Sequence, residues 1–262
     1  PLSRYLGNAY VTRWSIRHAG GLTGSTIHID GLRTTMTDVI VRIERRDGTT
    51  VVTRIQPSEP SLVVPEAPTR LELAWTYLVL GIEHILFGID HLLFVLALLM
   101  IVEGARRLVA TITAFTLAHS VTLVAATLGW VEVPGKPVEA VIALSIVFVC
   151  AEIVHHLRGR ESLTARAPWI VALVFGLLHG FGFAGALHEV GLPSHAIPLA
   201  LLLFNVGVEV GQLIFVACVL VAVAALRAPL RAAPPALRLV PAYGIGAVAM
   251  YWTIERVASF AA

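Results

Sequence analysis

Charged residues are scarce in this chain. They make up 14% of its 262 residues, whereas 57% are apolar, and the mean hydropathy is +0.82. Such a balance excludes an ordinary soluble protein for most of the length and places the chain in the membrane class. The formal net charge is only +2, and no basic stripe with interleaved aromatic residues occurs. We therefore expect no nucleic-acid partner.

Cysteine is also rare. Cys150 and Cys218 are the two in the sequence, and each lies within an apolar run. Residues of this kind are usually buried free thiols, so we expect neither a disulfide framework nor a cysteine-ligated metal site.

Residues 1–68 differ in composition from everything that follows. Segments rich in valine, isoleucine and threonine predict short strands at residues 9–17, 25–32, 38–44 and 49–56. The prolines between Pro57 and Pro68 predict a linker. About four strands are a small basis for an independent fold. Because the chain also starts at Pro1 instead of a methionine, we expect either the end of a larger β-domain or a domain that packs against the membrane part.

Residues 69–262 are predicted to form a helical membrane domain. Six apolar stretches approach the roughly 20 residues needed to cross the hydrocarbon core; they cover residues 73–102, 107–129, 138–157, 168–188, 196–226 and 238–258. The first is over-long, which predicts tilt or a break at Gly81 or Gly88. We expect an all-α polytopic membrane protein of about six transmembrane helices, preceded by a small extracytoplasmic β-region.

The short loops predict the orientation. Connections around Arg106, Arg160 and Arg231 are basic, whereas those at residues 130–137 and 189–198 carry almost no positive charge. Basic loops stay on the cytoplasmic side of a membrane. With six spans, both termini and the β-region are then expected to be extracytoplasmic.

The first apolar stretch contains the most informative residues of the chain, Glu83, His84, Asp90 and His91. A charged group in hydrocarbon costs at least about 2.5–3.5 kcal/mol, so such residues usually face a partner or a cavity. On a straight helix His84 and His91 share a face but stand about 10 Å apart, which would make His84 an outer gate. Imidazoles beside carboxylates in a dry interior suit a divalent cation or a proton path.

Three later spans also carry polar groups. His119 and Ser120 lie in the second span and His179 lies among glycines in the fourth. Asn205, Glu209 and Gln212 form a polar stripe on the fifth. Glu209 could ligate a cation, accept a hydrogen bond from a ligating histidine, or carry a proton.

Burying each of these groups separately would need separate compensation, so we expect them to share one site. The predicted metal ligands are His84, Asp90, His91, His119 and His179, with Glu209 as a further ligand or a partner of one.

These motifs, in this order, resemble the HupE/UreJ family of membrane proteins over about residues 40–258. The motif His84-x5-Asp90-His91 is also similar to the His-x4-Asp-His signature of nickel/cobalt transporters, with one extra residue. The resemblance implies a multi-pass protein of the bacterial inner (cytoplasmic) membrane that acts as a nickel or cobalt permease or accessory protein. It also implies metalloenzyme-maturation or periplasmic partners. The segment after His179-Gly180 departs from the hydrogenase-type pattern, which has a second His-Gly followed by Glu.

Two functions use the same donors. The first is uptake of a divalent transition-metal ion, with nickel or cobalt ahead of copper or zinc; ligation needs neutral imidazole, so binding should weaken as the pH falls through about 6.5. The second is an intramembrane zinc-dependent hydrolase with Glu209 as general base and Ser120 in support. A closed three-ligand site would favour hydrolysis, and donors along an open path would favour transport.

Overall fold

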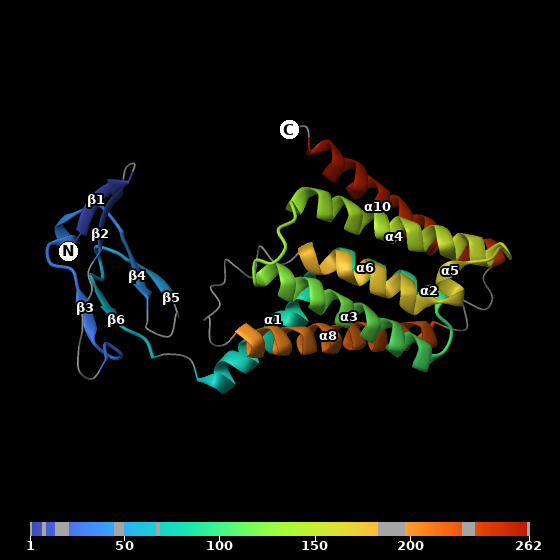
Figure 1. Ribbon diagram of the computed structural model, residues 1–262, viewed down its shortest axis with the longest axis horizontal. Helices are drawn as coiled ribbons and strands as arrows, with labels where there is room; N and C mark the ends of the chain where they lie inside the picture. Colours follow the sequence, from blue (N-terminus) through green and yellow to red (C-terminus); the bar gives the residue numbers. More distant parts are fainter. Residues whose placement is uncertain are drawn as a thin grey trace. The chain divides into compact units, whose positions relative to one another are not determined.

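The computed structural model describes residues 2–6, 9–13, 21–44, 50–66, 69–182, 197–226 and 234–260. It divides into two compact units, Pro1–Thr69 and Arg70–Ala262. The first unit contains the strands and the second contains the long helices (Figure 1).

The strands of the first unit form three antiparallel pairs. β1 (Leu2–Leu6) pairs with β2 (Ala9–Arg13), β3 (Thr26–His28) with β6 (Ser61–Val63), and β4 (Val39–Glu44) with β5 (Thr50–Ile55). β3 is shorter than predicted because Gly31, with φ 78°, leads the chain into the 3-10 turn η1 (Leu32–Thr34).

The segment that we predicted to be a linker contains a strand. β6 lies between Pro60 and Pro65 and pairs with β3. Proline is compatible with the ends of an edge strand, so prolines on both sides of a short apolar run do not prevent pairing. The sequence Arg45-Arg46-Asp47-Gly48 predicts a hairpin turn between β4 and β5, but it lies outside the described residues.

The second unit is helical throughout its described part. Its elements are α1 (Arg70–Phe87), α2 (Ile89–Ile101), α3 (Ala105–Thr127), α4 (Gly135–Leu157), α5 (Leu163–Arg166), α6 (Pro168–Gly182), α8 (Ile197–Ala225), η2 (Pro235–Leu239) and α10 (Val240–Ala258). α3, α4 and α8 are long and apolar enough to cross a membrane, and α1 with α2 qualifies as one bent span. The prediction of a helical polytopic membrane protein is therefore confirmed.

The two remaining predicted spans correspond to α6 and α10. The described part of α6 has only 15 residues, and the rest of the predicted span, residues 183–188, lies outside the described chain. α10 has 19 residues but includes Glu255 and Arg256, which lower its apolar character. Three or four spans in the described chain thus meet the criteria of length and composition, where the sequence predicted about six.

The first predicted span breaks at Gly88. α1 and α2 meet there at an angle of 71°, and Gly88 has φ −78° and ψ 87°, outside the helical region. A Cβ at this position would lie 2.6 Å from the carbonyl oxygen of His84. Gly88 is therefore the break point, whereas Gly81, the other predicted one, lies within α1.

Glycines bring the long helices together in pairs. α1 packs along α8, α3 along α6, and α4 along α10 (Figure 1). A Cβ on Gly81 would overlap the carbonyl oxygen of Phe204, and one on Gly180 would overlap that of His119. Small residues at such contacts let backbones approach closely in a membrane, and Gly176 and Gly180 of α6 lie at such contacts with the backbone of α3.

Candidate metal centre

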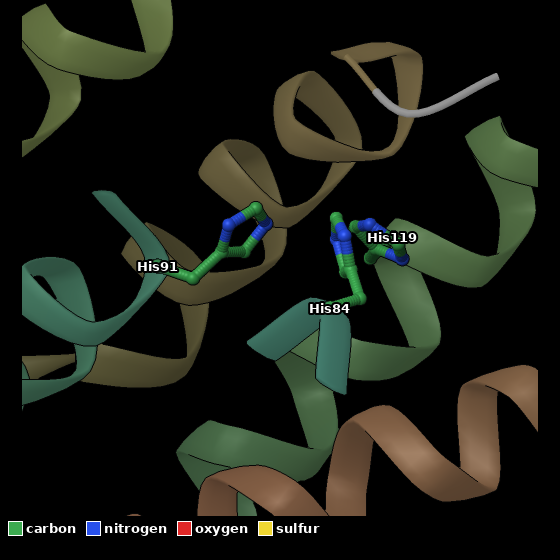
Figure 2. A group of neighbouring side chains, drawn as sticks. All are labelled: His84, His91 and His119. Carbon is green, nitrogen blue, oxygen red and sulfur yellow. The ribbon is translucent and has the colours of Figure 1, made fainter. Parts of the chain in front are cut away.

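Three histidines from three helices meet inside the helical unit. His84 comes from α1, His91 from α2 and His119 from α3. Their candidate ligand atoms all lie within 4.8 Å of one another, and they are the only such group in the described chain. Figure 2 shows the three rings turned towards a common space. We call His84, His91 and His119 the histidine cluster.

The break at Gly88 is what brings His84 to His91. Seven residues on a straight helix would separate them by about 10 Å along the axis, but their ring centroids are 4.8 Å apart. The expectation of a separation of about 10 Å is therefore wrong. It assumed a straight helix, and the bend makes His84 a member of the cluster.

His119 is the most enclosed member. It is fully buried, and neither ring nitrogen has a hydrogen-bond partner among the described residues. The side chain of Asn205 is near the ring, but it does not make a hydrogen bond with it and donates instead to the carbonyl oxygen of Leu201, at 2.7 Å. A buried polar group without a partner costs about 1–3 kcal/mol. A bound cation would remove that cost.

Asp90 positions His91. The Nδ1–H of His91 can donate to Oδ1 of Asp90, at 3.2 Å. The lone pair is then on Nε2, which is buried and has no hydrogen-bond partner in the described chain. Carboxylates behind metal-binding imidazoles commonly set the tautomer and ring orientation in this way.

His179 on α6 lies beside the cluster. Its ring centroid is 5.0 Å from that of His91, and the side chain is buried. Because a carbonyl oxygen can only accept, Nδ1–H donates to the Phe175 carbonyl, at 2.7 Å. That leaves the lone pair on Nε2, which has no partner among the described residues. The tautomer therefore suits a fourth nitrogen ligand.

Glu209 is not part of the cluster. Its Oε1 accepts a hydrogen bond of 2.6 Å from Thr113 on α3, and Thr116 donates to Gln212 at 2.9 Å. Thr113 precedes His119 by six residues, about 9 Å along the helix. The polar stripe of α8 therefore faces α3, and the partner of its carboxylate lies more than one helical turn from His119.

Ser120 is occupied within its own helix. Its hydroxyl donates to the carbonyl oxygen of Thr116, at 2.7 Å, which is an ordinary pairing for serine in an apolar helix. The two residues that a hydrolase would have used, Glu209 and Ser120, are thus engaged away from the histidine cluster.

A cavity of about 310 Å³ gives access to the site. Its lining includes His84, His91 and His179, together with Asp90, Glu139 and Arg256. His119 is not among the lining residues and closes the inner side of the cluster. An ion that entered the cavity would meet imidazole nitrogens and charged groups on the same wall.

Arg256 was missed by the sequence reasoning. Its Nη1 donates to the Glu139 carbonyl oxygen at 2.7 Å, and its Nη2 lies 3.5 Å from Oδ2 of Asp90. The signal was present, because Arg256 falls inside the last predicted span. The cost of charge in hydrocarbon that pointed to the histidines applies equally to a guanidinium.

The dimensions of the cluster fit a first-row divalent ion. In a tetrahedral site with metal–nitrogen bonds of about 2.1 Å, the nitrogens are about 3.4 Å apart. The ligand nitrogens of the cluster are at most 4.8 Å apart. To bind one ion they would have to come closer by about 1.4 Å or less, which side-chain rotation can supply. Imidazole ligands suit nickel, copper, zinc and iron better than calcium or magnesium.

The described chain is thus a polytopic helical membrane protein with a histidine cluster beside a cavity, and this donor set is compatible with a metal ion. A family profile described as "HupE / UreJ protein" matches residues 60–256, most of the chain, and the chain therefore belongs to the HupE/UreJ family. The resemblance drawn from the motifs is confirmed. No curated protein and no solved structure matches the chain.

Proposed function

We propose that this protein carries a divalent transition-metal ion across the membrane through the histidine cluster. The observation that carries the proposal is the convergence of three imidazoles from α1, α2 and α3 within 4.8 Å, at a site that opens onto a cavity lined by His84 and His91 and so differs from the closed three-ligand site of a hydrolase. Family membership and the cluster together support metal handling. Nickel and cobalt are the proposed cargo because of the family resemblance. The imidazole ligands alone do not select them, since imidazole also accommodates copper and zinc.

The cavity supports uptake rather than export. Glu139 near the start of α4 and Arg256 near the end of α10 line it. In the orientation predicted by the basic loops, both of these helix ends are extracytoplasmic. The ion would then enter from outside, reach His84 and His91 with His179 beside them, and meet His119 at the inner side.

Glu209 has a different role in this proposal from the one first expected. It lies along the α3–α8 interface with Thr113, Thr116 and Gln212, and one of its carboxylate oxygens is buried without a hydrogen-bond partner in the described chain. We assign this stripe to the path after the cluster, where weak oxygen donors receive the ion once it leaves the imidazoles.

Metal analysis combined with radiotracer flux in proteoliposomes tests the function. Wild type should bind nickel or cobalt and transport it, and His91→Ala should lose both activities. Glu209→Gln should retain most of the binding but lose flux, because Thr113, the partner of its carboxylate, lies about 9 Å along α3 from His119. His156→Ala is the matched control, since His156 is exposed at the end of α4.

Stoichiometric bound zinc in wild type without any flux would overturn the proposal. That outcome would favour the zinc-dependent hydrolase over the transporter, despite the position of Glu209. Loss of flux in His156→Ala equal to that in His91→Ala would show that the histidines matter for folding rather than for transport.

A further inference from the structure

The cavity that leads to the histidine cluster has three charged side chains on its wall. Asp90 comes from α2, Glu139 from α4 and Arg256 from α10. Nη2 of Arg256 is 3.5 Å from Asp90 Oδ2, and its Nε is 4.0 Å from Glu139 Oε2. The guanidinium therefore stands between two carboxylates that belong to different helices.

Several contacts fix the guanidinium in this place. Nη1 of Arg256 donates to the backbone carbonyl of Glu139 at 2.7 Å. One turn back on α10, the Trp252 ring centroid is 5.8 Å from the guanidinium carbon, within the range of a cation–π contact. The side chains of Arg256 and Asp90 are 24% and 23% exposed, so solvent screens this pair less than a surface pair.

Arg256 thereby determines which donor atoms the cavity offers. One oxygen of Asp90 is engaged by His91 and the other faces Arg256. Glu139, whose side chain is 56% exposed, has Oε2 4.0 Å from Nε of the same guanidinium. The groups available to an entering ion then include Nε2 of His91 and Nε2 of His179, which have no hydrogen-bond partner in the described chain. Without Arg256, two carboxylates from α2 and α4 would face the cavity with no fixed counter-charge.

We propose that Arg256 determines metal specificity by occupying the two carboxylates and so excluding Mg²⁺ and Ca²⁺. This inference rests on the proposed function, because it concerns the ion that the histidine cluster accepts. Mg²⁺ and Ca²⁺ bind through oxygen, and Mg²⁺ needs only one or two carboxylates with water. Transition-metal ions bind well to imidazole. A tethered cation on the carboxylates removes the oxygen donors and leaves the nitrogen donors unaffected.

Competition between Co²⁺ and Ca²⁺ tests the inference on purified full-length protein in detergent. Co²⁺ binding is followed by its visible absorption, with and without Ca²⁺, in wild type and Arg256→Gln. If the freed carboxylates resemble the weakest protein calcium sites, with Kd of about 1 mM, then about 10 mM Ca²⁺ should weaken apparent Co²⁺ binding about tenfold in the variant. Wild type should change by less than about twofold. Mg²⁺ should act in the same direction.

Two further variants sharpen the result. Arg256→Lys keeps the charge but replaces the planar guanidinium by one ammonium group, which can pair with one carboxylate at a time. The sensitivity of this variant to Ca²⁺ should therefore be intermediate. Arg256→Gln combined with Glu139→Gln removes the second oxygen donor and should restore resistance to Ca²⁺. Arg106→Gln, at the exposed start of α3, is the matched control and should behave like wild type.

A folded Arg256→Gln variant that binds Co²⁺ and ignores Ca²⁺ and Mg²⁺ would overturn the inference. Should that variant fail to fold, Arg256→Lys decides, since resistance equal to wild type would also overturn it. Failure of the proposed function is recognised separately, because wild type itself would then show no Co²⁺ binding or flux.

Discussion

Replacing Gly88 with alanine should weaken metal binding without unfolding the protein. The added Cβ would lie 2.6 Å from the carbonyl oxygen of His84 and 3.0 Å from Nδ1 of His91, whereas ordinary contacts begin at 3.4 Å. The backbone at His84 must therefore retreat by about 0.8 Å and the His91 ring by about 0.4 Å, the differences between those distances. Both movements act directly on members of the histidine cluster.

The size of the effect follows from the tolerance of such sites. Binding groups need to be held within about 0.5 Å of their working positions, and alanine also favours a continuous helix over glycine by about 1 kcal/mol, which opposes the 71° bend. We expect Co²⁺ affinity to fall about 10- to 100-fold, which is the usual loss when a residue that orients a metal ligand is removed. That corresponds to about 1.4–2.8 kcal/mol of binding free energy.

Titration calorimetry with Co²⁺ on purified protein measures this loss. Gly244→Ala is the matched control, because it is the same substitution in α10 and a Cβ there meets no atom within 4 Å. Thermal unfolding of both variants separates loss of binding from loss of fold. A Gly88→Ala protein that folds and binds Co²⁺ as tightly as wild type would refute the account of the bend.

Three further outcomes are expected. Asp90→Asn should weaken Co²⁺ binding about 10- to 100-fold in the same titration, because the imidazole that it orients loses its carboxylate; an unchanged affinity would remove Asp90 from the site. Gly207→Ala should lower the free energy of unfolding by about 1–3 kcal/mol, seen as a lower melting temperature, because its Cβ would overlap the carbonyl of Leu78. Cysteines placed at Arg160 and Glu132, in a background without Cys150 and Cys218, should react with impermeant thiol reagents from opposite sides of the membrane; labelling from one side only would contradict the predicted orientation.

The residues of the site could be found from the sequence because they are expensive to bury. His84, His91, His119 and His179 are ionisable groups in apolar runs, and this cost alone singles them out. The structure brings the first three together and places His179 beside them. That they hold a metal ion stays a prediction, and so does the identity of the ion, since imidazole donors suit several metals.

The distances between residues on different helices could not be predicted from the sequence in the same way. A periodic pattern assigns side chains to the face of a straight helix, so it gave the wrong distance between His84 and His91 across a glycine bend. It placed Glu209 on the correct stripe of α8 but could not say that Thr113 is its partner. Arg256 was overlooked because it lies near the end of an apolar stretch, where long basic side chains often reach the membrane surface.

The bend at Gly88 is held by the protein's own backbone hydrogen bonds where it meets the cavity. Irregular backbone inside a membrane is stable only where protein or water satisfies its polar groups. The N–H of Gly88 donates to the carbonyl oxygen of His84, and its C=O accepts from the N–H of Leu92. Gly88 also lines the cavity of about 310 Å³, so the residue that turns the helix borders the space through which an ion would arrive. Filling that space with a bulky apolar side chain would therefore block the entry of the ion and leave the backbone hydrogen bonds of the bend in place.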